Sequence, residues 1–125
     1  MSGLMKVLGV VWLGSRTRKF DELSRMFSKT MGMRILHHEE GMSVFRAEDG
    51  DLIEVFGMDH NDVRFFPTAP VAGFLVEDIE KGREELMTDG IRCGEVEGDG
   101  RGNKWMHFVA PDGNMYQLNE HSRKK

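Results

Sequence analysis

The chain has 125 residues, of which 39% are hydrophobic and 30% charged, and its formal net charge is −4. Such a composition is typical of a soluble globular domain, and the excess of acidic groups argues against a nucleic-acid partner. The longest apolar runs fall short of the ~20 residues that a membrane span needs, so no membrane partner is expected. Cys93 is the only cysteine, which excludes an intrachain disulfide and, with no signal-peptide pattern in the first residues, predicts a cytoplasmic protein.

The first half of the chain predicts a strand, a helix and three further strands. Residues 7–13 are apolar and β-branched, which favours a buried strand that Gly14 closes. Thr17 is placed to cap a helix that ends near Gly32 and carries apolar residues at helical spacing, namely Phe20, Leu23, Met26 and Phe27. Alternating runs then predict strands over 34–38, 42–47 and 52–56.

The second half of the chain repeats this order after a linker. Residues 59–70 are rich in turn formers and contain two prolines, which disfavour regular helix. Residues 71–76 then predict a strand, and Asp78 is placed to cap a helix that ends at Gly90. Three further strands are expected at 91–96, 105–109 and 115–119.

One segment of the sequence occurs twice, from Phe45 to Glu54 and again, 63 positions later, from Phe108 to Gln117. Each copy places an Asp-Gly turn between two alternating runs, which is a strong signal for a β-hairpin. After the helices the offset falls to 58, and a longer loop at 98–104 restores it. This compensation indicates a duplicated unit. We therefore predict an α+β fold in which two βαβββ units form a cupped, mostly antiparallel sheet with the helices on the outside.

Two segments carry a resemblance to a known family. Ala110 to Leu118, which reads Ala-Pro-Asp-Gly-Asn-Met-Tyr-Gln-Leu, and Gly73 to Asp78 resemble the vicinal oxygen chelate superfamily over about residues 5–120. That superfamily includes glyoxalase I, bleomycin-resistance proteins and extradiol dioxygenases. The resemblance implies a single domain over 1–125, with unit one at about 5–58, the linker at 59–70 and unit two at about 71–120. It also implies a small-molecule ligand and a homodimer.

The resemblance and the period of two in a strand together indicate which residues face the cup. In the metal-bearing relatives the carboxylate after each hairpin points inward, which places Glu54 and Gln117 there. Alternation then adds further cup residues, namely Val10, Trp12, Val44, Arg46, Leu52, Phe56, Trp105, His107, Val109, Met115 and Asn119. The helix side receives Phe45, Ile53, Val55, Phe108, Tyr116 and Leu118 by the same rule.

The resemblance also makes a metal site testable on the sequence. The family's site takes one ligand from the first strand of each unit and one from the last. Residues 7–12 and 68–76 contain no His, Asp, Glu, Gln or Cys, so the first strands supply no ligand, and no cofactor is expected. If a divalent metal binds, its ligands are Glu54, His107 and Gln117, since about three protein ligands are needed.

The candidate site residues each keep two interpretations. Glu54 is either a general base whose pKa burial raises, or a carboxylate paired with Gln117 or Arg46. His107 is either a proton shuttle or ligand donor, or a hydrogen-bonded wall residue. The rings of Trp12, Phe56 and Trp105 either stack on a planar ligand or fill the core.

The remaining polar residues are less specific. Arg46 either holds an anionic group or lies exposed at a strand edge, and Asn119 joins Gln117 as a ligand contact. His37 and His38 point to opposite faces of a strand and are not a metal pair. His60 and His121 lie outside the regular elements and are expected to be solvated.

These observations favour a protein that binds a small aromatic or anionic molecule without a standard metal site. The alternative is a divalent-metal-dependent lyase of the glyoxalase I kind, an isomerase or a dioxygenase that uses Glu54, His107 and Gln117. A third possibility is a metal-free acid–base enzyme that uses Glu54 and His107. The fold alone does not choose between binding and catalysis, because one fold hosts many functions.

Overall fold

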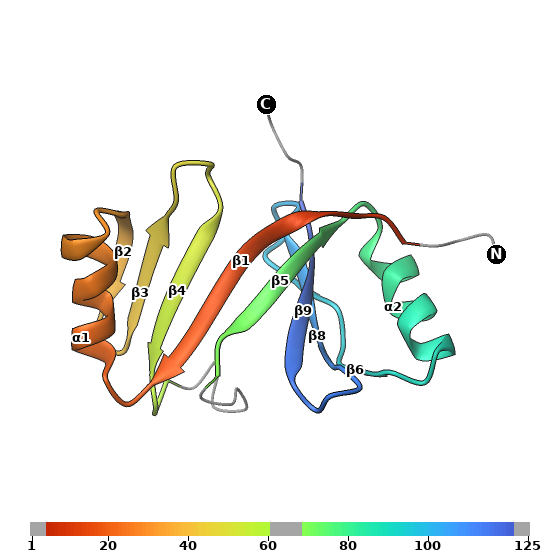
Figure 1. The fold of residues 1–125 in the computed structure, drawn as a ribbon. Coiled ribbons are helices and arrows are strands. Elements are labelled where there is room, and N and C mark those ends of the chain that lie inside the picture. The colour runs from red at the N-terminus through yellow and green to blue at the C-terminus, as the bar shows by residue number, and fades with distance from the viewer. Residues whose placement is uncertain (1–4, 61–68, 122–125) are drawn as a thin grey trace. The chain divides into compact units, whose positions relative to one another are not determined.

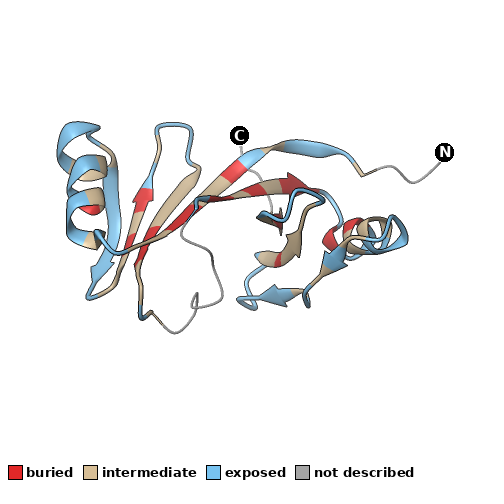
Figure 2. Ribbon diagram, turned by 60° about the horizontal axis from the view of Figure 1, so that its bottom comes forward, coloured by how far each residue is buried: buried red, intermediate tan, exposed pale blue. Residues whose placement is uncertain are grey.

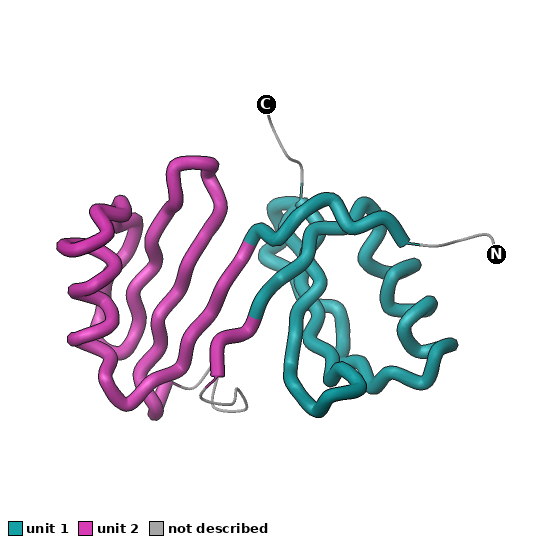
Figure 3. The backbone as a smooth tube through the Cα atoms, in the orientation of Figure 1, with its two compact units in different colours: residues 1–11, 72–125 teal, residues 12–71 magenta. Residues whose placement is uncertain are grey.

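The structure is a computed structural model that describes residues 5–60 and 69–121. The chain divides into two compact units (Figure 3): unit 1 contains Met1–Val11 and Ala72–Lys125, and unit 2 contains Trp12–Val71. The predicted linker at 59–70 therefore lies mostly outside the described residues. The elements of unit 2 are β1 (Val7–Thr17, which begins in unit 1), α1 (Phe20–Arg25), the π-helical turn η1 (Met26–Thr30), β2 (Arg34–Glu39), β3 (Met42–Arg46) and β4 (Leu52–Gly57) (Figure 1).

In unit 2 the strand order is β2-β3-β4-β1. The pairs β2–β3 and β3–β4 are antiparallel, and β4 pairs in parallel with the Trp12–Thr17 half of β1. The helix packs on one face of this sheet, where the ring of Phe27 meets that of Phe45 at a centroid distance of 5.8 Å. Phe45 and Val55 are buried on this side, so the side chains that alternate with them occupy the opposite, helix-free face.

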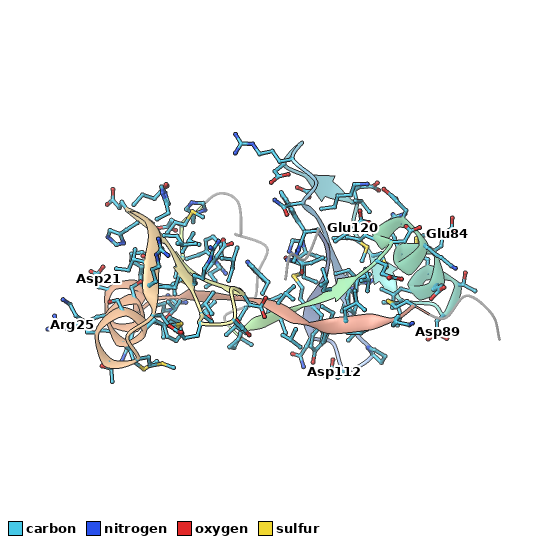
Figure 4. The ribbon with its side chains drawn as sticks, turned by 90° about the horizontal axis from the view of Figure 1, so that it is seen from above. Asp21, Arg25, Glu84, Asp89, Asp112 and Glu120 are labelled. Atoms are coloured by element: carbon cyan, nitrogen blue, oxygen red, sulfur yellow. The ribbon has the colours of Figure 1, made fainter. Side chains whose placement is uncertain are left out.

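Unit 1 repeats the plan with β5 (Val71–Val76), α2 (Ile79–Thr88), β6 (Arg92–Cys93), β7 (Glu97–Gly98), β8 (Lys104–Val109) and β9 (Met115–Glu120). Its strand order is β5-β9-β8-β6, with β7 also paired to β8, and β5 pairs in parallel with β9. Asp78 caps α2 by accepting a hydrogen bond from the backbone N–H of Lys81 at 3.1 Å. Glu120, at the end of β9 (Figure 4), accepts the N–H of Ile79 at 2.9 Å.

The core of unit 1 lies between α2 and its sheet. Val76, Ile79, Met106 and Leu118 form a buried cluster there, with Phe108 packed against it. Buried positions alternate with more exposed ones along β3, whereas β4 and β9 each bury two adjacent residues, and β2 of unit 2 is exposed throughout (Figure 2). Met106 and Leu118 therefore face the helix, whereas His107 and Gln117 face away from it.

The two units share their hairpin register. Phe45 lies opposite Ile53 and Phe108 opposite Tyr116, and Val44 lies opposite Glu54 as His107 lies opposite Gln117. The turns match as well, since Gly50 and Gly113 have φ values of 92° and 86°, which L residues with a side chain rarely adopt. The α+β fold built from two βαβββ units is thus confirmed, and so is the predicted division between helix-side and helix-free residues in the two hairpins.

Three details of the sequence-based prediction are wrong. β1 continues to Thr17, so Gly14 lies inside the strand and does not close it. The N-cap of α1 is Lys19, and the hydroxyl of Thr17 accepts its N–H at 3.0 Å. The strand expected at 91–96 is shortened to Arg92–Cys93. None of the helices in the described part of the chain is long and apolar enough to cross a membrane.

Candidate functional site

Glu54 occupies the helix-free face of unit 2. It lies on β4 between Gly14 of β1 and Val44 of β3, and its side chain is only partly exposed. The indole N–H of Trp12 donates a hydrogen bond to Glu54 Oε2 at 2.9 Å. In the described residues no hydrogen bond or ion pair joins Glu54 to Arg46, so that alternative is wrong. The amide nitrogen of Gln117 donates to Asn119 at 3.1 Å, and a pair between Glu54 and Gln117, which lie in different units, stays a prediction.

The indole of Trp12 reaches Glu54 by lying over Gly14. Trp12 and Gly14 share a face of β1, because they are two residues apart. A Cβ atom placed on Gly14 would stand 2.1 Å from Cη2 and 2.6 Å from Cζ2 of Trp12, far closer than any van der Waals contact. Gly14 is required here for space, although the sequence suggested only a strand end.

The environment of Glu54 changes its acidity. Burial raises the pKa of the Glu54 carboxyl above its ordinary value of 4.5, and the Trp12 hydrogen bond and the nearby His60 oppose this rise. Burial dominates because a charged carboxylate loses hydration that one indole N–H does not replace. Glu54 is therefore the group on this face that can exchange a proton at a pH nearer to neutrality than an ordinary carboxyl does.

This shift predicts a pH-dependent stability. Because the pKa is raised on folding, the folded protein binds more protons than the unfolded chain between pH 4.5 and the folded pKa, so the free energy of unfolding falls as pH rises through that interval. Glu54→Gln is expected to remove this fall and to be more stable than wild type at neutral pH. Urea unfolding from about pH 4 to about pH 8 measures it.

The control for this experiment is Glu48→Gln, which changes the charge equally at an exposed position of the β3–β4 turn. It is expected to follow the pH dependence of wild type. An equal flattening of the pH dependence in both variants would show that Glu54 is not responsible.

Unit 1 carries the equivalent polar residues. His107 lies opposite Gln117 on β8 and β9, and Trp105 lies opposite Asn119. Gln117 is 5% exposed. Burial lowers the pKa of the His107 imidazole, and its hydrogen bond with Gln117 opposes that change, so this ring favours the neutral form. The three residues His107, Gln117 and Asn119 thus form one hydrogen-bonded polar row on the helix-free face.

The residues of each unit do not fit a divalent metal. At Glu54 the neighbouring strand presents the N–H of Trp12, which has no lone pair to donate to a cation. In unit 1 the corresponding strand, Val71–Val76, has only apolar side chains and glycine. Within residues 5–60 and 69–121, no three His, Cys, Asp or Glu side chains gather in a group that could hold a metal ion.

The other predicted site residues differ in their solvent exposure. Arg46 is exposed at the end of β3, whereas Phe56 is 3% exposed and packs against the ring of His60 at 5.5 Å. The expectation that His60 is solvated is wrong, since its side chain is 14% exposed. This position was not predictable from the sequence, because nothing in the turn at 57–60 indicates that it folds back onto β4. His37 and His38 do face opposite ways, the first toward Glu39 and the second toward Ser43.

Two hollows open on the surface of unit 2, and neither includes Trp12 or Glu54. One, of about 410 Å³, lies between α1 and the edge of the sheet, with Asp21 and Arg25 of α1 (Figure 4) at its border and Ser43 at its floor. The other, of about 600 Å³, is lined by Glu39, Asp59 and His60 among others. Trp12 and Glu54 lie together on the helix-free face of unit 2 and outside both hollows.

Comparison with known proteins supports the fold. Neither the family models nor the curated proteins give a match to this sequence, but solved structures do. The Mn(II)-bound glyoxalase from Novosphingobium aromaticivorans matches with a TM-score of 0.74 at 14% identity, over 98% of this chain and 43% of that one. The chain therefore spans less than half the length of that glyoxalase.

Two further structures match over nearly their whole length. Methylmalonyl-CoA epimerase from Mycobacterium tuberculosis gives a TM-score of 0.68 at 15% identity, over 94% of this chain and 90% of that one. A glyoxalase/bleomycin resistance protein/dioxygenase superfamily member from Vibrio splendidus 12B01 gives 0.66 at 13% identity, over 94% and 99%. The chain thus has the vicinal oxygen chelate fold, as the resemblance implied.

Proposed function

We propose that the protein binds a small organic molecule, aromatic or anionic, against the helix-free faces of its sheets and without a standard metal site. The hydrogen bond from Trp12 to Glu54 carries the proposal, because the group that β1 places beside this partly buried carboxylate is an indole N–H, which has no lone pair and cannot serve as a second metal ligand. Glu54 and His107 act as the polar centres of these faces. Trp12 and Trp105 supply rings, and Arg46, Gln117 and Asn119 complete the contacts, whereas Phe56 is 3% exposed and packs against His60.

One observation favours an enzyme as the second candidate function. A partly buried carboxyl with a raised pKa has the property of a general base, and structures of similar fold include a Mn(II)-bound glyoxalase and an epimerase. The second candidate is therefore a lyase, isomerase or dioxygenase that binds a divalent metal through Glu54, His107 and Gln117. The absence of ligating side chains on the two first strands supports the binding protein over this candidate.

The metal content of the purified protein separates the two candidates. We expect protein prepared without a polyhistidine tag to contain far less than one equivalent of Mn, Fe, Ni or Zn by mass spectrometry. Glu54→Ala should give the same result. Near-stoichiometric metal in wild type that disappears in Glu54→Ala would overturn the proposal in favour of the metal enzyme.

A ligand screen tests the binding function itself. A ligand that binds the folded protein raises its melting temperature. At a free ligand concentration of about 100 times Kd, the free energy of unfolding rises by about 2.7 kcal/mol. We expect compounds with an aromatic ring to stabilise wild type, and Trp12→Ala to weaken their effect after correction for its own stability. The homodimer implied by the resemblance is measured by sedimentation on the same samples.

A further inference from the structure

We infer that the hollow between α1 and the sheet of unit 2 is a second binding site, for a small uncharged molecule that carries an apolar ring and a hydroxyl group. We call it the helix-side hollow. Its volume is about 410 Å³ and its lining comes from α1, η1, β2 and β3, which suits a small organic ligand. The inference goes beyond the proposed function, because the helix side and the helix-free face are opposite sides of this sheet.

The floor of the hollow is a chain of hydrogen-bonded side chains. The Ser24 hydroxyl of α1 donates to Ser43 Oγ of β3 at 3.4 Å, and this oxygen lies 2.7 Å from Nδ1 of His38 on β2. Ser43 is 1% exposed and Ser24 8% exposed, whereas His38 is exposed and stacks on the ring of Phe20 at 6.1 Å. The chain therefore connects the buried floor with an accessible imidazole that also lines the hollow.

This chain matches a ligand hydroxyl. A serine hydroxyl both donates and accepts a hydrogen bond, and a neutral imidazole has one nitrogen of each kind. A hydroxyl on the ligand has the same two capacities. A carboxylate only accepts and an ammonium only donates, and either would lose hydration against buried hydroxyls that carry no compensating charge. The floor therefore favours an uncharged head group.

The charged residues at the border do not favour either sign of ligand. Asp21 and Glu22 lie in the first turn of α1, whereas Arg25 lies in its last turn and Lys29 in η1. All four line the hollow, and their formal charges cancel. Acidic groups at the start of a helix and basic groups at its end complement the helix dipole, so these residues are explained by the helix itself.

The apolar wall accounts for the ring of the ligand. Ile35 of β2 lies directly opposite Phe45 of β3, and both line the hollow. Phe45 is buried, but Ile35 is 52% exposed. A ring seated against Ile35 removes apolar surface from water, which favours binding in proportion to the area covered.

The helix above the hollow changes its geometry at this site. α1 continues into the π-helical turn η1, in which the N–H of Met31 donates to the carbonyl of Met26, five positions earlier, at 2.9 Å. Ser28 and Lys29 of η1 line the hollow. Turns of this kind inside helices occur frequently at functional sites, which supports a binding role for this side of the unit.

The duplication of the chain explains why the hollow exists. Ser43 and Met106 are equivalent at the offset of 63, since Ser43 lies opposite Val55 as Met106 lies opposite Leu118. Met106 is fully buried and fills the core of unit 1 beneath its helix. The shorter serine leaves this volume open in unit 2 and places a hydroxyl at its base.

Three probes with one ring test the ligand class. At neutral pH benzyl alcohol is uncharged, benzoate is an anion and benzylamine is a cation, and each is titrated by NMR chemical-shift changes. We expect benzyl alcohol to bind wild type at least about tenfold more tightly than either charged probe. Equal or tighter binding of a charged probe, or no binding of benzyl alcohol, would overturn the inference.

Ser43→Met tests the location, and Ser15→Ala is the control. The equivalent position of unit 1 already holds a methionine, so the variant is expected to fold with its hollow filled and to bind benzyl alcohol at least about tenfold more weakly. Ser15 is a buried serine of unit 2 that does not line the hollow, and its truncation should leave this affinity unchanged. Wild-type affinity in a folded Ser43→Met would contradict the assignment, because binding on the helix-free face is insensitive to this change.

Ser43→Ala covers the case in which Ser43→Met does not fold. It keeps the space and removes the hydroxyl, so benzyl alcohol affinity should fall several-fold while toluene, which has the ring alone, binds the variant and wild type equally. Circular dichroism checks the fold. Unchanged benzyl alcohol affinity, or an equal loss for both probes, would refute the role of the hydrogen-bonded floor.

Discussion

Replacing Phe45 by alanine is expected to lower the free energy of unfolding by about 3–5 kcal/mol, the usual cost of deleting a buried phenylalanine. Phe45 is 1% exposed on the helix side of β3, and its ring meets that of Phe27 in an edge-to-face pair at 5.8 Å. The ring joins η1 to the sheet of unit 2 through Phe27, so its loss removes both buried area and an aromatic pair. Urea unfolding followed by circular dichroism measures the change.

Ile35→Ala is the matched control for this measurement. Ile35 lies directly opposite Phe45 on β2 and on the same face of the sheet, but it is 52% exposed. Its truncation is expected to cost less than about 1 kcal/mol, as surface substitutions do. If both substitutions cost the same, the helix does not pack on β3 as the structure has it.

The success of the sequence-based fold prediction has a specific cause. A strand fixes side-chain direction with a period of two, and an Asp-Gly turn fixes the register of the strands it joins. The segment from Phe45 to Glu54 contains both signals, and its copy from Phe108 to Gln117 repeats them. Assigning Glu54 to one face therefore assigned Phe45 and Val55 to the other, where both are buried, and the second hairpin repeats this register.

The interactions of Glu54 were not predictable in the same way. Periodicity states which face a side chain occupies, but not which neighbour on that face it touches. Trp12 is two residues from Gly14, and only the lack of a Cβ on Gly14 lets the indole lie back toward Glu54. The sequence contained this signal as a glycine inside an apolar run, which often marks a close approach, whereas we interpreted it as the end of the strand.

The position of His60 shows a second limit of sequence-based prediction. Turn composition at 57–60 predicts a break in the strand, but it carries no information on where the chain goes next. In the structure the His60 ring returns to Phe56, its Nε2 lies 4.0 Å from a Glu39 oxygen, and its charge acts on Glu54. Long-range contacts of this kind depend on the path of the backbone, and no local pattern encodes them.

Met106→Ala and His107→Gln are expected to separate stability from binding at two adjacent residues. Met106 is fully buried in the cluster with Val76, Ile79 and Leu118, so its truncation should cost about 2–5 kcal/mol of unfolding free energy. The folded variant should still bind a ligand of the wild-type protein with unchanged affinity, because Met106 faces α2 and not the helix-free face. Denaturant unfolding and calorimetric titration at a temperature where both proteins are folded give the two quantities.

His107→Gln should show the opposite pattern. Its ring faces away from α2 and bonds to Gln117, so ligand affinity should fall several-fold while the loss of stability at neutral pH stays near the ~1 kcal/mol of one hydrogen bond. Because burial lowers the pKa of His107, the unfolded chain binds more protons below its ordinary pKa, and wild-type stability falls as pH drops through that range. The variant should lose this dependence. Weaker binding in Met106→Ala together with unchanged binding in His107→Gln would place the ligand on the helix side of unit 1 and refute the assignment of the site to the helix-free faces.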